Sequence, residues 1–280
     1  MTMLSPVADL VRRYDRDRYL TALFAPADRR EALMALYAFN HEVAKTRESV
    51  TEPMLGRIRL QWWREGLDAA YDTGPVRQHE VMVPLADAIR RFGLTRDEFE
   101  RLIDARELDL EAEPPATVAA LEAYCADSSG RLQALALEIL GVRDAEAMVA
   151  AREVGTAYAL TGLLRAIPFH ARARRLYIPA DLSREVGLDV AALFELKPTA
   201  ALAIAAGRLA AGAHAHLSAA RARARSIPAA ALPALLPARL ASVYLRALER
   251  GGFDVFDPRL ALPRGGNGLR LAWAALIRRY

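Results

Sequence analysis

The sequence predicts an all-α fold, and three observations support this prediction. Apolar residues recur at intervals of three and four along most of the chain, which is the spacing of one face of a helix. Alternating runs rich in β-branched residues, which are typical of strands, are almost absent. Glycine and proline mostly fall between the apolar segments, where they separate one helix from the next.

The composition favours a single domain over residues 1–280. Hydrophobic residues make up 53% of the 280, enough for a large core, and no linker or fixed-period repeat divides the chain. Cys125 is the only cysteine, so an internal disulfide is excluded and a reducing compartment is favoured. Acidic and basic residues crowd the N-terminus, which argues against a secretory signal. The Ala-rich run 199–212 is too short for a transmembrane helix and contains Arg208.

The charge pattern does not indicate nucleic-acid binding. The formal net charge is +4, and arginine supplies nearly all of the positive charge, since Lys45 and Lys197 are the only lysines. Charges of both signs alternate along the chain and no nucleic-acid motif is present. A mild attraction to anionic lipid is compatible with this balance.

The first part of the chain predicts five helices, over residues 6–24, 26–48, 53–71, 81–92 and 95–110. Pro26 opens the second, with Asp28 as a candidate N-cap. Gly93 ends the fourth as a C-cap would. Thr95 and Glu98 have the spacing of a capping box at the start of the fifth. The acidic residues that follow predict a solvated face: Glu107, Asp109, Glu111 and Glu113.

The second part predicts further helices, over residues 118–141, 145–167, 181–187, 190–196, 199–225, 238–250 and 269–280. Ser128, Ser129 and Gly130 interrupt the first of these. Pro168 ends or kinks the second, because its ring clashes with the carbonyl four residues back.

The stretch 159–179 passes abruptly from apolar to charged residues. An apolar helical run delivers Arg165, and the cations Arg172, Arg174 and Arg175 follow Pro168. Such a cluster suggests an anionic ligand such as a diphosphate. The carboxylates that would hold a metal at a metal-diphosphate site are missing here.

Several short segments together carry a family resemblance. They are residues 26–30, 35–39, 63–64, 92–94, 124–125, 160–161, 163–165, 171–172 and 177–179. In these segments the chain resembles the squalene and phytoene synthase family from about Arg18 to Arg250. The resemblance implies an isoprenoid synthase fold with a central cavity. Family enzymes join two prenyl diphosphates head to head, using magnesium held by two aspartate-rich motifs on facing helices.

Both aspartate-rich motifs are degraded in this chain. At the first, the residues are Ala44, Lys45 and Glu48, of which only Glu48 keeps a carboxylate. At the second, the residues are Gly162, Arg165, Ala166 and His170. Magnesium prefers hard oxygen ligands, and one carboxylate from two motifs cannot supply the usual site. The comparison with the family therefore implies no catalytic residue, no metal ligands and loss of magnesium binding.

Further matches lie at residues 38–40, 42, 44, 49–50, 52, 164–166, 168, 170, 253–254, 256 and 280. In these residues the chain resembles one branch of the family, the mitochondrial respiratory complex I assembly factors, which also lack the aspartates. The resemblance implies a non-catalytic role in early assembly of NADH dehydrogenase. The expected partner is a complex I subunit or an assembly intermediate, whose identity no residue reveals. The expected location is the cytoplasm, or peripheral on the inner membrane.

Two alternatives remain open at the sequence level. The residues that could bind a prenyl diphosphate or an anionic lipid directly are Lys45, Arg47, Arg165, Arg172, Arg175 and Tyr177. Internal ion pairing with acids such as Glu42 and Glu48 would also account for these cations. His170 could act as a general base or hydrogen-bond to local backbone. The alternative function is that of a divergent prenyltransferase of the phytoene or squalene synthase type.

Overall fold

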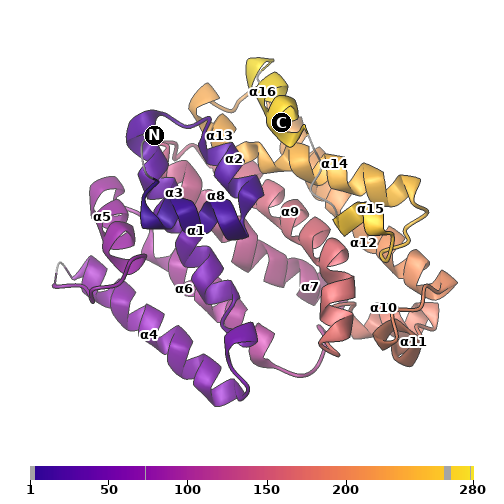
Figure 1. Cartoon of the computed structure of the whole chain (residues 1–280). Coiled ribbons are helices and arrows are strands. Elements are labelled where there is room, and N and C mark those ends of the chain that lie inside the picture. Colours follow the sequence, from indigo (N-terminus) through magenta and orange to yellow (C-terminus); the bar gives the residue numbers. More distant parts are fainter. Residues whose placement is uncertain (1–3, 73, 262–265, 278) are drawn as a thin grey trace.

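The computed structural model describes residues 4–72, 74–261, 266–277 and 279–280, and these contain helices and turns but no strand (Figure 1). The α-helices are α1 (Pro6–Tyr14), α2 (Arg16–Ala22), α3 (Ala27–Ala44), α4 (Pro53–Tyr71), α5 (Met82–Phe92), α6 (Arg96–Glu107), α7 (Val118–Cys125), α8 (Arg131–Ile139), α9 (Ala145–Arg172), α10 (Ala180–Val186), α11 (Val190–Phe194), α12 (Ala200–Ala222), α13 (Leu232–Leu235), α14 (Pro237–Arg250), α15 (Pro258–Ala261) and α16 (Asn267–Leu276). The short turns are the 3-10 turns η1 (Arg47–Ser49), η2 (Leu108–Leu110) and η4 (Ala229–Ala231), and the π-helical turn η3 (Ala126–Gly130).

Helix α9 is the central element of the fold. It packs against α12 and α14 on one side and against α7, α8 and η3 on the other. Figure 1 shows it between the purple N-terminal helices and the orange C-terminal ones. Apolar side chains from nearly every helix join one buried cluster around it. Burial on several faces explains why α9 is apolar over most of its 28 residues.

Helices α9 and η3 approach so closely that only a glycine fits between them. A Cβ atom on Gly155 would lie 2.6 Å from the Cα of Gly130 and still closer to the carbonyl oxygen of Ser129. The sequence correctly places an interruption at residues 128–130, where α7 widens into η3 before α8 begins. The π-helical turn and Gly155 therefore form one packing unit.

Several local predictions are confirmed and several are wrong. Helix α4 has the predicted bounds, and Gly93 adopts the left-handed conformation of a C-cap, with φ of 60°. The predicted first helix is two helices, because Asp15 leaves the helical conformation and its side chain accepts from the amide of Arg18. Asp28 is not a cap, since α3 begins directly after Pro26. The sequence predicted no helix between residues 250 and 269, whereas the structure has the short helix α15 there and starts α16 at Asn267; residues 262–265 lie outside the described part of the chain.

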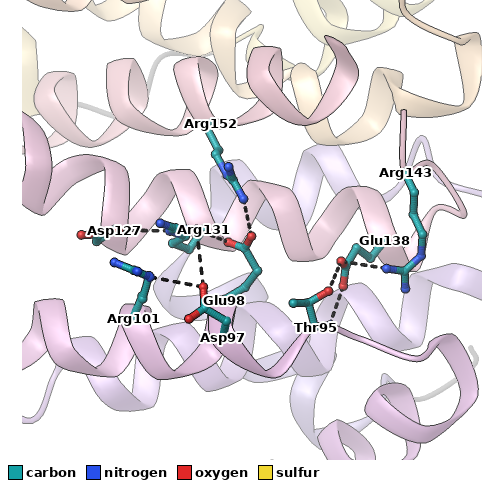
Figure 2. A network of polar contacts seen from close by, with 9 residues as sticks. All are labelled: Thr95, Asp97, Glu98, Arg101, Asp127, Arg131, Glu138, Arg143 and Arg152. Atoms are coloured by element: carbon teal, nitrogen blue, oxygen red, sulfur yellow. Dashed lines mark hydrogen bonds and ion pairs between the residues drawn. The ribbon is translucent and has the colours of Figure 1, made fainter. Parts of the chain in front are cut away.

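The predicted capping box at Thr95 is wrong, and Figure 2 shows what replaces it. The amide and hydroxyl of Thr95 both donate to the buried carboxylate of Glu138 on α8, at 2.7 and 2.5 Å. Arg143 donates to the same carboxylate at 3.0 Å. Glu98 does not reach back to Thr95 and instead pairs with Arg131 and Arg152. Two buried carboxylates therefore tie α6 to α8 and α9.

The helix α9 runs past Pro168 to Arg172, so the predicted end at residue 167 is wrong. Leu164, Ile167 and Ala171 continue its buried face across the proline. A proline inside a helix costs about 3 kcal/mol, and burial of these side chains offsets that cost.

No single helix among the described residues is long and apolar enough to cross a membrane; the bent pair Ala229–Leu235 and Pro237–Arg250 meets the test by length and composition alone.

Candidate functional site

The first degraded motif lies at the C-terminal end of α3. Ala44 is the last residue of the helix, Lys45 follows it, and Glu48 lies in the turn η1. Lys45 forms an ion pair with Glu42, whose buried carboxylate also accepts from Arg59 at 3.1 Å. A buried carboxylate needs such partners to offset its lost hydration. The charge of Lys45 is therefore balanced within the protein.

The second degraded motif lies on α9, and its residues diverge. Arg165 lies over the ring of Tyr244, with its guanidinium carbon 3.7 Å from the ring centroid. Its side chain forms no hydrogen bond or ion pair within the described chain, and Nε is buried. A Cβ atom on Gly162 would meet no atom within 4 Å. His170, near the end of α9, lies against the ring of Tyr177, with centroids 4.5 Å apart.

The two motifs meet at one cavity of about 460 Å³, which we name the motif cavity. Its lining residues come from the end of α3, the turns η1 and η2, the helices α6 and α7, the second half of α9 and the segment that follows it: Ala44, Arg47, Glu48, Val50, Arg106, Asp109, Tyr124, Leu163, Phe169, His170, Ala173, Arg175 and Tyr177. Glu48 and Asp109 are the carboxylates in this lining.

Asp109 is the centre of a buried network that the sequence analysis missed. Tyr124 and Tyr177 donate their hydroxyls to it at 2.9 and 2.8 Å, and Arg106 lies 3.4 Å away. Arg106 also donates to the Tyr124 hydroxyl at 2.6 Å. The prediction of a solvated acidic face is therefore wrong at Asp109. One feature of the sequence could have indicated that Asp109 is buried: it lies between two apolar residues, Leu108 and Leu110, within an acidic run.

Burial governs the protonation of the groups around this network. It lowers the pKa of His170 to about 4, helped by the positive charge of Arg175, so the imidazole is neutral near pH 7. Burial, followed by the negative charge of Asp109, raises the pKa of Tyr177, so its hydroxyl keeps the proton that it donates. The His170 ring forms no hydrogen bond among the described residues, contrary to the expected bond to local backbone.

The six residues predicted to bind an anion do not converge. Arg47, Arg175 and Tyr177 line the motif cavity. Arg165 instead lines a second cavity, of about 690 Å³, between α1, α2, α9, α14 and the start of α16. Lys45 is paired with Glu42, and the exposed Arg172 lines neither cavity.

The residues at the motif cavity do not fit the magnesium site that the aspartate-rich motifs would build. Glu48 is the one motif carboxylate, and Asp109 is already engaged by three side chains. Within the described ranges, no group of three or more His, Cys, Asp or Glu side chains is placed to hold a metal ion. The cavity leaves Arg47 and Arg175 to meet an anion, since the hydroxyls of Tyr124 and Tyr177 already donate to Asp109, and its described lining offers no cluster of hard oxygen ligands.

The motif cavity also has a neighbour. Asp109, Tyr124, Arg175 and Tyr177 line a further hollow of about 340 Å³, together with residues from 108 to 120. The Asp109 network therefore stands between two spaces.

Comparisons with known proteins agree on the family. The squalene/phytoene synthase family model matches residues 11–266. The chain is 34% identical over 252 residues to NADH dehydrogenase (ubiquinone) complex I, assembly factor 6 of Bos taurus, covering 90% of this chain and 75% of that protein. It is 31% identical over 172 residues to presqualene diphosphate synthase of Rhodopseudomonas palustris, covering 61% of this chain and 60% of that enzyme.

The fold agrees with a solved structure at lower sequence identity. A dehydrosqualene synthase in complex with ligand superposes with a TM-score of 0.83 at 20% identity, covering 98% of this chain and 96% of that one. The predicted all-α isoprenoid synthase fold is confirmed by this likeness. The chain belongs to the squalene/phytoene synthase family.

Proposed function

We propose that this protein acts in the assembly of respiratory complex I, the NADH dehydrogenase, and does not catalyse prenyl transfer. The observation that carries the proposal is the loss of carboxylates where the two motifs meet: Glu48 remains, beside Ala44 and His170. The similarity to the assembly factor covers 90% of the chain, whereas that to the presqualene diphosphate synthase covers 61%.

The electrostatics of the site support a non-catalytic role. Cleaving a prenyl diphosphate builds negative charge on the leaving group, which bound metal ions offset in metal-dependent enzymes. Here Glu42 pairs with Lys45 and Arg59, and Asp109 pairs with Arg106, so internal carboxylates already use part of the positive charge. We propose that the partner is a complex I subunit or assembly intermediate, and that binding takes place in the cytoplasm or at the inner membrane.

A deletion strain tests this function. We expect deletion to lower both the amount of assembled NADH dehydrogenase on native gels and the NADH-dependent quinone reduction of membranes. Re-expression of the wild type, and equally of Glu48→Gln, should restore both, because the last motif carboxylate has no catalytic task. Normal complex I in the deletion strain would contradict the proposal. Failure of Glu48→Gln alone would show that carboxylate chemistry is still needed.

A second candidate function is binding of a prenyl diphosphate or anionic lipid in the motif cavity without turnover. Arg47 and Arg175 favour it, because both line the cavity and, among the residues that the structure describes, donate only to backbone carbonyls, those of Val50 and Glu111. Titration calorimetry with farnesyl diphosphate, with and without magnesium, tests it. We expect metal-independent heat that is lost in Arg175→Gln and no condensed product by mass spectrometry. Silent titrations would exclude this candidate.

A further inference from the structure

The outer face of α16 carries an exposed apolar stripe, defined as Leu269, Trp273, Leu276 and Ile277. Their exposed fractions are 78%, 58%, 75% and 43%. Spacings of four and three residues place Leu269, Trp273 and Leu276 on the same side of the helix, and Ile277 follows directly after its last residue. The opposite face is anchored, since Leu271 and Ala274 are buried against α14 in a small cluster with Leu236, Leu240 and Tyr244. Large apolar side chains gathered in this way mark an interaction surface.

Positive charge flanks the start of this stripe. Residues 266–268, at the start of α16, share a cavity with Arg12, Arg13 and Arg16, and also with Asp15 and Asp17. Arg12 and Arg13 are paired with Asp9, but the exposed Arg16 has no ion pair among the residues described. Helix α16 also contacts α2, which begins at Arg16.

Positive charge also flanks the end of the stripe. After α16 the chain folds back, and the Nε of Arg221 donates to the carbonyl of Tyr280 at 3.0 Å. Burial and the neighbouring charges of Arg246 and Arg239 lower the pKa of Arg221, so these three cations lie close together. Neither Arg239 nor Arg246 forms an ion pair within the described ranges.

Acidic residues are missing from this part of the sequence. Residues 258–280 contain five arginines and no aspartate or glutamate, and residues 197–248 contain none either. The stripe therefore consists of apolar side chains that include a tryptophan, cations flank it, and residues 258–280, which contain it, have no acidic residue. That combination is the one an interfacial membrane helix needs.

We propose that α16 docks this protein on the surface of a bilayer that contains anionic phospholipid. The apolar stripe enters the boundary between headgroups and acyl chains, and the flanking arginines contact lipid phosphates. A bilayer satisfies both features at once, because acyl chains accept side chains of any shape and headgroups supply phosphate on every side of the helix. The inference stands apart from the proposed assembly role and rests on α16 and the arginines that flank it.

Vesicle sedimentation tests the proposal. The full chain is mixed with vesicles of phosphatidylcholine alone, or of phosphatidylcholine with phosphatidylglycerol, at low and high salt. We expect binding to the anionic vesicles that weakens as salt rises. The triple variant Leu269→Gln, Trp273→Gln, Leu276→Gln should lower the partition coefficient by at least about tenfold, since it removes most of the inserted apolar surface.

A matched control separates α16 from exposed apolar residues elsewhere. Met54 and Ile58 on α4 are 58% and 60% exposed. The double variant Met54→Gln, Ile58→Gln therefore makes a comparable change on a helix other than α16. We expect this double variant to bind as the wild type does. Every substituted side chain is exposed, so we expect both variants to fold, and thermal unfolding checks that they do.

A fluorescence measurement locates the contact. Brominated lipid should quench the wild type on binding, and Trp273→Phe should still bind but lose that quenching. The proposal is overturned if the wild type ignores anionic vesicles or if the triple variant binds as tightly as the wild type. It is equally overturned if light scattering shows a wild-type dimer that the triple variant disperses, which would make a second copy the occupant.

Discussion

The close contact between α9 and η3 makes a sharp prediction about two glycines of one helix. In Gly155→Ala the new methyl meets backbone, the carbonyl of Ser129 and the Cα of Gly130, which cannot rotate away. Overpacking of this kind costs about 1–3 kcal/mol. In Gly162→Ala the methyl meets nothing within 4 Å, and alanine is the better helix former by about 0.5–1 kcal/mol.

The two variants should therefore move stability in opposite directions and differ by roughly 1.5–4 kcal/mol. Urea unfolding followed by circular dichroism measures the difference, and thermal melting should place Gly155→Ala several degrees below the wild type, at roughly 2–4 °C per kcal/mol. Equal stability of the two alanine variants would refute the packing argument, since both share the helix and the chemistry of the change.

Three further predictions concern buried polar groups. Asp109→Asn should lower the free energy of unfolding by about 3–5 kcal/mol in urea titrations, because Arg106 loses its buried counter-ion; an unchanged midpoint would contradict the network. His170 has a folded pKa of about 4, below its ordinary 6.5, so unfolding takes up a proton between these values. Stability should therefore rise with pH across that window, and His170→Gln should flatten the rise in melting temperature. Glu98→Gln should cost about 1–3 kcal/mol by denaturation, as Arg152 loses its carboxylate; Asp97→Asn, at an exposed position, is the control.

The sequence predicted the fold class and most helices because the helical spacing of apolar residues is a local signal. It failed where contacts distant in sequence decide the local conformation. Thr95 has the residues of a capping box, yet Glu138, 43 residues away, takes both of its donors. Pro168 has the local mark of a helix end, yet the buried face of α9 continues beyond it.

The candidate site was predicted in part, for the same reason. Motif spacing located the residues that surround the motif cavity, including Glu48 and His170. It could not show that Arg165 lines a different cavity from Arg175, because the two residues are only ten positions apart, on α9 and just after its end. Nor could it show Asp109 buried, since three partners from separate segments, Arg106, Tyr124 and Tyr177, create that environment.

The network around Asp109 has a consequence for the size of any guest molecule. Asp109, Tyr124, Arg175 and Tyr177 line both the 460 Å³ and the 340 Å³ hollow. A compact guest molecule can occupy one hollow and leave these side chains in place. A guest long enough to occupy both hollows would have to pass these side chains, among them the Tyr177 hydroxyl bonded to Asp109.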